Sequence, residues 1–292
     1  IVVTTSNSEG KGQKAKITQY IGYDTPKAAD NLKLDINAET GDVNLAWDAV
    51  TAGVNNGFIG DIKYDVVRYP GETVVAKGIT ATSATDKLNT RDLTAYAYGV
   101  KAYNDKKTSA EARTDYKLYG DAITPPYAEG FDSEYAMAYF TVINNNNDNS
   151  TWTYYKNSDG SGEARYEYDT KNGGDDWLIT PPLKVEKGKI YTVKFKAKSY
   201  KSSFVERLEV KYGSTNTVEG MKNVIMESTD LPGDAFHEYT KEITASEDGT
   251  LYIGFHAVSD ADKFYLELDD ISVGAGMSTT APDAVSELTA VP

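Results

Sequence analysis

The chain has 292 residues, of which 40% are hydrophobic, so it is long enough for two domains of ordinary size, each with a buried core. A formal net charge of −14 makes nucleic acid and anionic membrane surfaces poor partners, and no apolar run approaches the roughly 18 residues of a membrane span. There is no cysteine, which excludes disulfides, thiolate metal sites and cysteine nucleophiles. The acidity suits divalent cations, which prefer carboxylate and carbonyl oxygens, or it only keeps the chain in solution.

The first residues of the chain are similar to a segment further along it. Val2–Asp24 aligns without gaps with Gly99–Asp121 at an offset of 97 residues, and the two segments then reach Pro26 and Pro125. Such a period indicates an array of similar modules, although chance similarity between β-rich segments is the alternative. We therefore expect residues 1–24 to be the C-terminal strands of a preceding repeat.

A shorter match points to another repeat at the other end of the chain. Residues 26–32 and 282–288 share the spacing of a proline, an alanine and a leucine. Residues 277–292 are therefore expected to be the start of a following repeat or a linker. Two complete modules would lie between the fragments, at residues 25–124 and 125–276.

The first complete module is predicted to consist of strands. Val43–Trp47, Tyr64–Tyr69 and Tyr96–Asn104 alternate apolar and polar residues, and a Pro-Gly turn follows the second of them. A period of two gives each strand one buried face and one solvent-facing face. Tyrosine, with 22 copies in the chain, suits such half-buried strands.

The order of these strands resembles a fibronectin type III domain. Trp47 stands where such a domain has its core tryptophan, and Tyr96 stands where it has the corner tyrosine that leads into the sixth strand. Thr90 replaces the leucine expected six residues before that tyrosine, so the corner departs from the family pattern. The resemblance implies a two-sheet sandwich that serves as a spacer or a binding surface.

The second module, residues 125–276, has longer polar loops between its strands. Alternation predicts strands at Tyr191–Ala197, Leu208–Gly213, Leu251–Phe255 and Phe264–Ile271. Such strands, joined by loop insertions, predict a jelly-roll (galactose-binding-like) sandwich, so the whole chain is expected to be all-β. One short helix is expected around Val218–Glu227.

Four motifs of this module resemble the cleaved-adhesin (choice-of-anchor J) family. They are Glu129–Asp132, Asn144–Trp152, Asp175–Pro181 and Leu268–Ile271. Members of the family lie beside fibronectin type III repeats in bacterial proteins, including haemagglutinin regions of gingipain-type proteases. The resemblance implies a non-catalytic adhesion or structural module of a larger secreted or cell-surface protein. Its partners would be host or matrix proteins, glycans and the rest of the parent polypeptide, with its signal sequence outside this segment.

The resemblance also implies a structural calcium ion between the first and last strands of the jelly roll. Glu129 and Asp132 on the first strand, with Asp269 and Asp270 on the last, would supply the hard oxygen ligands. In a regular strand Asp269 and Asp270 point to opposite faces, so at most one is buried unless the strand bulges. The alternative is that these are solvated carboxylates or partners of Lys or Arg.

A carbohydrate-binding module, accessory to a secreted hydrolase or protease, is the alternative function. Trp152, Tyr154, Tyr155 and Trp177 lie around two loops, where flat rings stack on sugars, and Asp148 offers hydrogen bonds to hydroxyls. The competing interpretation makes the tryptophans core anchors and the tyrosines cross-strand pairs. Because Tyr154 and Tyr155 are adjacent, we expect one of them to face solvent.

The sequence contains no recognisable catalytic constellation. His237 and His256 lack zinc-site spacing, and no nucleophile elbow or phosphate-binding loop occurs. The run Asn144–Asn149 resembles the start of an EF-hand but has Asn rather than Gly at the sixth position, so a polar surface loop is expected. Residue types alone do not exclude a glycosidase pair of carboxylates. We expect a protein without enzymatic activity.

Overall fold

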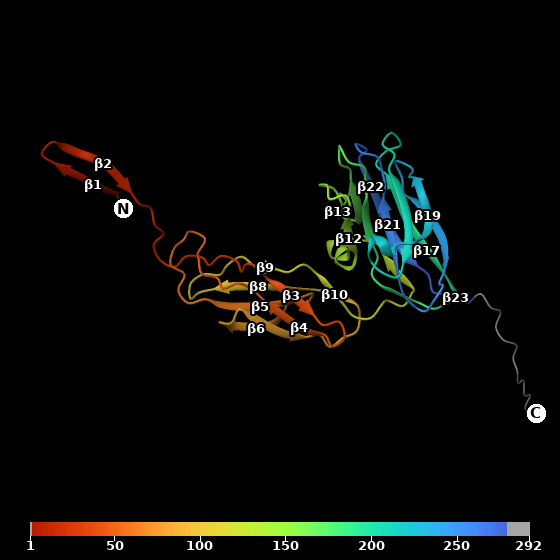
Figure 1. Cartoon of the computed structure of the whole chain (residues 1–292), viewed down its shortest axis with the longest axis horizontal. Coiled ribbons are helices and arrows are strands. Elements are labelled where there is room, and N and C mark those ends of the chain that lie inside the picture. Colours follow the sequence, from red (N-terminus) through yellow and green to blue (C-terminus); the bar gives the residue numbers. More distant parts are fainter. Residues whose placement is uncertain (1, 279–292) are drawn as a thin grey trace, which may run out of the picture. The chain divides into compact units, whose positions relative to one another are not determined.

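The computed structural model describes residues 2–278 and divides the chain into two compact units, Ile1–Gly120 and Asp121–Pro292 (Figure 1). Apart from two 3-10 helices, every regular element in the described residues is a strand, which confirms the all-β prediction. No helix between residues 2 and 278 has the length and apolar character needed to cross a membrane. Most of the predicted start of a following repeat, residues 277–292, lies outside the described residues.

The first element of unit 1 is a two-stranded antiparallel hairpin, formed by β1 (Val2–Asn7) and β2 (Gly10–Lys16). Every residue of both strands is exposed, so the hairpin buries no face against a core. The Asn7 side chain closes the turn by accepting hydrogen bonds from the backbone N–H groups of Glu9 and Gly10, at 3.0 and 3.1 Å. The assignment of residues 1–24 to a preceding repeat stays a prediction.

The rest of unit 1 is a sandwich of two antiparallel sheets. One sheet has the order β3-β4-β7, and the other has the order β10-β8-β5-β6, with β9 paired to β8. The first sheet consists of β3 (Lys33–Ile36), β4 (Asp42–Ala46) and β7 (Ser83–Lys87). The second consists of β5 (Lys63–Tyr69), β6 (Thr73–Ile79), β8 (Thr94–Tyr103), β9 (Ala112–Arg113) and β10 (Lys117–Tyr119).

The core of this sandwich follows from the alternation in the sequence. In β4, Val43 and Leu45 are buried while the residues beside them are exposed. Trp47 packs edge-on against Tyr64 of the other sheet, with 5.4 Å between the ring centroids. Both rings belong to one buried cluster with Val66. The strands predicted for residues 43–47, 64–69 and 96–104 are thereby confirmed within a residue or two.

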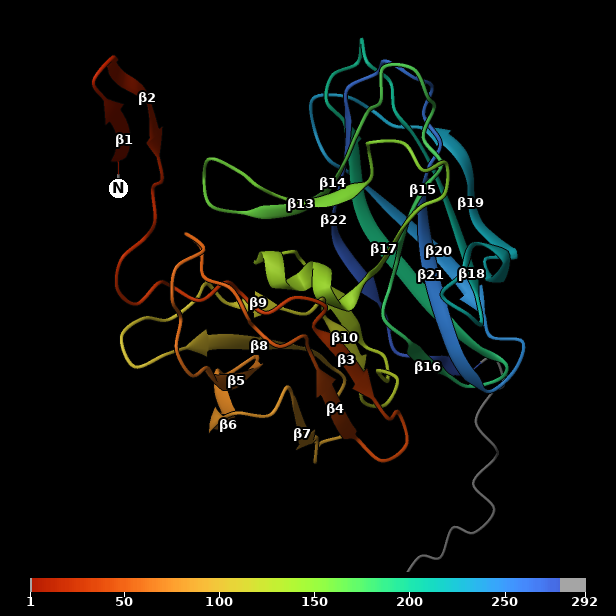
Figure 2. The same cartoon turned by 60° about the vertical axis from the view of Figure 1, so that its left-hand side comes forward.

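Unit 2 is a larger sandwich of two antiparallel sheets (Figure 2). The first sheet contains β13 (Trp152–Lys156), β14 (Gly162–Glu167), β22 (Tyr265–Val273), β17 (Lys189–Ser199) and β20 (His237–Thr244), in that order, with β11 (Tyr127–Glu129) on β22 and β23 (Met277–Ser278) on β17. The second contains β12 (Thr141–Asn144), β15 (Asp176–Ile179), β21 (Gly249–Ala257), β18 (Arg207–Gly213) and β19 (Asn223–Asp230), in that order, with β16 (Leu183–Val185) on β21.

The two sheets of unit 2 enclose one continuous apolar core. Phe195 of β17 meets Phe255 of β21 in a T-shaped contact with 5.2 Å between ring centroids. Leu208 and Leu266, from opposite sheets, are fully buried in the same cluster. This core fixes which face of each strand points outward, and so it positions the surfaces described below.

The prediction of a helix around Val218–Glu227 is wrong beyond the first turn. Only Val218–Gly220 forms a 3-10 helix (η2), and the chain then enters β19, which pairs with β18. Gly220 weakens a helix at this point, and the β-branched pair Val224 and Ile225 favours extended backbone. A second 3-10 helix, η1 (Glu134–Tyr139), has no counterpart in the sequence prediction.

Candidate functional site: an aromatic surface over a charge network

The outward face of the β13-β14-β22-β17-β20 sheet holds the candidate site of unit 2. Along β22, Leu266 and Leu268 enter the core, so Tyr265 and Glu267 point to the other face. Arg165 of β14 pairs with Glu267 across the ladder and therefore shares that face.

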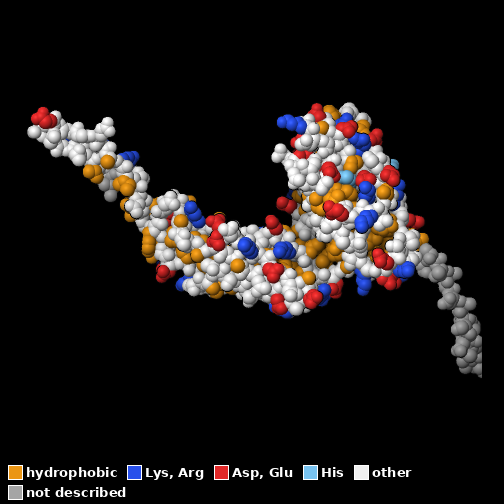
Figure 3. Space-filling view, in the orientation of Figure 1, with side chains coloured by type: hydrophobic (Ala, Val, Ile, Leu, Met, Phe, Trp, Pro, Cys, Tyr) orange, Lys and Arg blue, Asp and Glu red, His pale blue; other side chains and the backbone are white. Residues whose placement is uncertain are grey.

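Five aromatic rings meet where β22 begins and β17 ends. The Tyr200 ring stacks on Phe264 at 4.5 Å and tilts against Tyr265 at 4.7 Å between centroids. Phe264 also contacts Tyr168 at 5.7 Å and Phe204 at 5.8 Å. Phe204 is 37% exposed and the other four are half-buried, so the cluster reaches solvent. In Figure 3, hydrophobic side chains reach the visible surface of unit 2 between charged ones.

Tyr155 extends this cluster across Arg165. The Arg165 guanidinium carbon lies 3.2 Å from the centroid of the Tyr155 ring and 4.0 Å from that of Tyr265. A guanidinium this close to two rings gains cation–π attraction and holds both rings in place. We call the six rings the aromatic platform: Tyr155, Tyr168, Tyr200, Phe204, Phe264 and Tyr265.

A charge network lies beneath the aromatic platform, formed by Glu163, Arg165, Lys198 and Glu267. Arg165 donates to Glu163 at 2.9 Å and also pairs with Glu267, which pairs in turn with Lys198. Glu163 and Glu267 are both 2% exposed. Burial raises the pKa of Glu163 to about 7, and the adjacent Glu267 carboxylate adds to this effect. Arg165 thus connects the network to the rings of Tyr155 and Tyr265.

The predicted calcium ligands lie together in an acidic seam, defined as Glu129, Asp132, Asp269 and Asp270. Strand β11 pairs with β22, which sets Glu129 opposite Ile271. Burial and the nearby Asp132 charge raise the pKa of Glu129. Burial likewise raises the pKa of Asp269 to about 6, with contributions from the Asp270 and Asp132 charges. As they stand, no three acidic or histidine side chains among the described residues converge in a geometry that would hold a metal ion.

The last strand bulges at the acidic seam. Pairing with β17 skips from Ser272 to Asp269, and Asp270 adopts a left-handed backbone with φ 48°. The bulge leaves Asp270 exposed, where it pairs with Lys196 at 2.7 Å, while Asp269 is half-buried and accepts a hydrogen bond from the Asp270 N–H. Asp269 and Asp270 therefore no longer face strictly opposite sides.

The two predicted tryptophans are buried. Trp152 is 2% exposed and its indole N–H donates to the Asp176 carbonyl at 3.1 Å. Trp177 is 3% exposed and stacks on His256 with 3.9 Å between ring centroids. Neither ring presents a face to solvent: Trp152 belongs to the core between the sheets, and Trp177 belongs to a separate buried cluster with Ile179 and Met221. Tyr154 is half-buried against the core and Tyr155 is 39% exposed, so of this adjacent pair Tyr155 is the one that faces out.

The Asn144–Trp152 loop is held by its own polar side chains. Asp148 accepts hydrogen bonds from the Asn146 amide at 2.9 Å and the Ser150 N–H at 2.8 Å. Both of its carboxylate oxygens are thus used within the loop. Nearby, burial raises the pKa of Asp176 to about 6, and the Asp148 charge adds to this.

His256 on the second sheet is held between two carboxylates. Its Nδ1 lies 3.0 Å from Glu209 and its Nε2 lies 2.8 Å from Asp175. Such contacts orient the ring over Trp177 and leave neither ring nitrogen free. The arrangement links β15, β18 and β21.

Of the six platform rings, only Tyr155 is among the ligand residues that the sequence predicts. The other five are not among them: Tyr168, Tyr200, Phe204, Phe264 and Tyr265. The last four of these rings come from the ends of β17 and β22, which are distant in sequence. Aromatic residues lie in or beside the predicted strands Tyr191–Ala197 and Phe264–Ile271, but no local pattern shows that these two strands pair. Adjacent strands would bring those aromatics to one sheet edge.

No family model and no curated protein matches the chain. Two cleaved adhesin domains of Lys-gingipain from Porphyromonas gingivalis match in structure, with 18% and 20% identity and TM-scores of 0.43 and 0.42. They cover 51% and 52% of this chain and 96% and 98% of their own. A xylan-binding domain from Paenibacillus barcinonensis matches with 9% identity and a TM-score of 0.38, covering 55% of this chain and all of its own. Adhesin domains and carbohydrate-binding modules are the two classes that the sequence predicts, but at these scores we assign no ligand from them.

Proposed function

We propose that this chain is a non-catalytic adhesion segment of a secreted or cell-surface protein, and that unit 2 binds a glycan on the aromatic platform. The observation that carries the proposal is the cluster of five partly exposed rings that Arg165 joins to a sixth, Tyr155. Pyranose rings have apolar faces that stack on flat aromatics, while their hydroxyls need nearby donors and acceptors.

The fixed geometry of the rings supports this proposal. Tyr265 contacts Tyr200, Phe264 and the Arg165 guanidinium at once, so few of its rotamers remain open. A preformed surface loses little conformational entropy when a ligand binds. Side chains ordered in this way favour recognition of a rigid ligand with an apolar face, such as a pyranose ring.

Unit 1 fits the role of a fibronectin type III spacer. Its two antiparallel sheets, β3-β4-β7 and β10-β8-β5-β6 with β9 on β8, support this proposal, because a fibronectin type III domain is a sandwich of two such sheets. The burial of Trp47 and Tyr96, at 5% and 7% exposed, also supports the proposal, because the resemblance implies a core tryptophan and a corner tyrosine there.

We also propose that the acidic seam holds a structural calcium ion. Glu129 and Asp269 are half-buried carboxyl groups whose pKa values burial raises, and such groups gain from a cation that offsets their charge. Glu129, Asp132 and Asp269 are the residues that would hold the ion, since Asp270 already pairs with Lys196. Bound there, calcium would tie the first strand of the jelly roll to the last.

A glycan array with the whole chain and its variants tests the proposed function. Tyr155→Ala and Tyr265→Ala should each weaken binding of a positive glycan about tenfold, because a stacked ring contributes on the order of 1 kcal/mol. Tyr116→Ala is the matched control, because Tyr116 lies in unit 1 and is 38% exposed, close to the 39% of Tyr155. Absence of binding by the unaltered chain, or equal binding by all variants, would overturn the proposal.

A further inference from the structure

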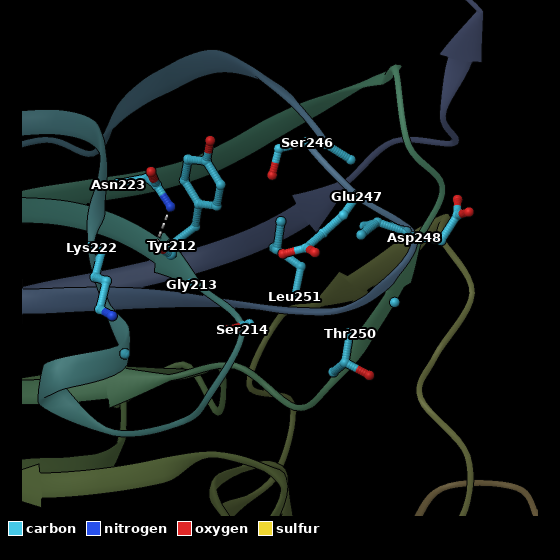
Figure 4. Close-up of a pocket in the computed structure, with 14 residues that line it drawn as sticks. Tyr212, Gly213, Ser214, Lys222, Asn223, Ser246, Glu247, Asp248, Thr250 and Leu251 are labelled. Atoms are coloured by element: carbon cyan, nitrogen blue, oxygen red, sulfur yellow. Dashed lines mark hydrogen bonds between the residues drawn. The ribbon is translucent and has the colours of Figure 1, made fainter.

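A pocket lies at the other end of the unit 2 sandwich (Figure 4). It is a pocket of about 360 Å³, open to solvent, between the end of β18 with η2 on one side and the β20–β21 turn on the other. This volume is within the range of small-ligand sites. We call it the end pocket.

The floor and one wall of the end pocket are apolar. Val185, Ala245 and Leu251 form the floor, and each is 5% exposed or less. The half-buried ring of Tyr212 packs against the core and forms a wall. The pocket therefore offers an apolar surface, including one aromatic ring, of the kind on which the apolar face of a sugar ring rests.

The rim of the end pocket is polar and includes one carboxylate turned inward. Figure 4 shows Glu247 extending toward Tyr212 and Leu251, while Asp248 points away. Asp248 accepts a hydrogen bond from the Lys187 N–H at 2.7 Å, whereas Glu247 has no hydrogen-bond or ion-pair partner among the described residues. The remaining polar groups on the rim are side chains of Ser214, Lys222, Asn223, Ser246 and Thr250.

We propose that the end pocket binds a terminal neutral sugar residue of a glycan. One face of the sugar would rest on Tyr212 and the apolar floor, and adjacent hydroxyls would donate to the Glu247 carboxylate. The Ser246 hydroxyl and the Asn223 amide flank that position and supply further hydrogen bonds. A carboxylate facing inward disfavours sugars that carry an acid group.

The end pocket and the aromatic platform lie at opposite ends of β17. Lys189, the first residue of β17, accepts a hydrogen bond from Ala245 of the pocket floor at 3.0 Å. Ser199, the last residue, precedes Tyr200 of the platform. A strand of 11 residues is about 35 Å long, so the two sites are separate. The inference rests on the proposed function only for the ligand class, and the two sites together would make unit 2 bivalent.

Saturation-transfer difference NMR on the whole chain tests the end pocket. The probes are free D-glucose, D-galactose, D-mannose and N-acetyl-D-glucosamine, with D-glucuronic acid as the anionic comparison. At least one neutral sugar should show transfer, and Glu247→Gln should weaken its binding about tenfold, because a charged hydrogen-bond acceptor is replaced by a weaker neutral one. Glu242→Gln is the matched control, since Glu242 is exposed on β20 and lies outside the pocket.

The variants distinguish this inference from the proposed function. Loss of monosaccharide binding in Glu247→Gln, with binding retained in Tyr265→Ala, supports the end pocket. Loss of monosaccharide binding in Tyr265→Ala alone overturns the proposal for the end pocket and is consistent with the proposal for the aromatic platform. No transfer from any neutral sugar, or stronger transfer from D-glucuronic acid, also overturns it. Thermal melting checks that the Glu247→Gln variant is folded, as expected for an exposed residue.

Discussion

Asn55 donates two hydrogen bonds to the carboxylate of Asp24, from its side-chain amide to Oδ1 at 2.9 Å and from its backbone N–H to Oδ2 at 2.7 Å. The backbone N–H of Gly57 adds a third at 2.9 Å. A side chain at position 53 would not fit, because a Cβ on Gly53 would lie 2.3 Å from the Asp24 carboxylate. The Asp24 backbone carbonyl also accepts from the Asn104 amide at 3.0 Å. Asp24 therefore ties three segments together at one end of the sandwich of unit 1.

Replacement of Asp24 should destabilise unit 1 in a pH-dependent way. Burial alone would raise the pKa of Asp24, but hydrogen bonds from Gly57, Asn55 and Thr25 outweigh it and lower the pKa to about 2. Because the folded-state pKa lies below the unfolded value, the contribution is present above about pH 4 and is lost as the pH falls through 2. Asp24→Ala should lower the Tm of unit 1 by several degrees at pH 7.

The control for this prediction is Asp30→Ala, which removes an exposed carboxylate nearby. Melting curves of both variants at pH 7 and pH 2 provide the comparison. A Tm for Asp24→Ala equal to that of the Asp30 variant at pH 7 would contradict the prediction.

Glu163 should make unit 2 less stable as the pH rises. Burial and the adjacent Glu267 raise the pKa of Glu163 to about 7, above its unfolded value, while the Arg165 and Asn157 hydrogen bonds act in the opposite direction. Because the fold favours the protonated form, Glu163 stabilises unit 2 fully below about pH 4. This stabilisation is lost as the pH rises from about 4 through about 7. Glu163→Gln should flatten the fall in Tm between pH 5 and pH 8, and a slope identical to that of the unaltered chain would refute the assignment.

Calcium should raise the Tm of unit 2. Ligand that binds only the folded state stabilises it by mass action, so excess CaCl₂ should increase the Tm and EDTA should reverse the increase. Asp269→Asn should abolish the difference, whereas Asp230→Asn, which changes an exposed residue at the end of β19, should preserve it. An unchanged Tm in calcium and in EDTA would count against an ion at the acidic seam.

The two cores should melt independently. Phe255→Ala removes a fully buried ring from unit 2 and should destabilise it by about 3–5 kcal/mol. Val66→Ala creates a smaller cavity in the separate core of unit 1. Calorimetry should show each substitution lowering only one of two transitions. A single transition that shifts with both substitutions would show that the cores unfold together.

Strands were the predictable part of the fold, because their signal is local. From Tyr96 to Ala102 an apolar residue recurs at every second position, and β8 (Thr94–Tyr103) follows this run closely, although it is buried on both faces from Ala95 to Val100. The helix prediction for Val218–Glu227 failed because the apolar residues of this segment fit a short helix as well as a strand. Pairing with β18 settles the choice, and that pairing is a tertiary contact which no local pattern encodes.

The candidate site was predictable only in its parts. Glu129 and Asp269 belong to sequence motifs that indicate the acidic seam. The bulge at Asp270, however, depends on the register in which β22 pairs with β17. The aromatic platform joins Tyr155 to Tyr265, which are far apart in sequence. Its rings are brought together by strand order, which alternation does not determine.

Strand β17 also determines how unit 2 would respond to mechanical load. It is hydrogen-bonded on one side to β20 and on the other to β22 along most of its length. A glycan pulling at the Tyr200 end against a second one at the Lys189 end would stress the ladders parallel to the strand. Its hydrogen bonds would then share the force at the same time instead of opening one after another, which is the loading direction in which a sheet resists extension best.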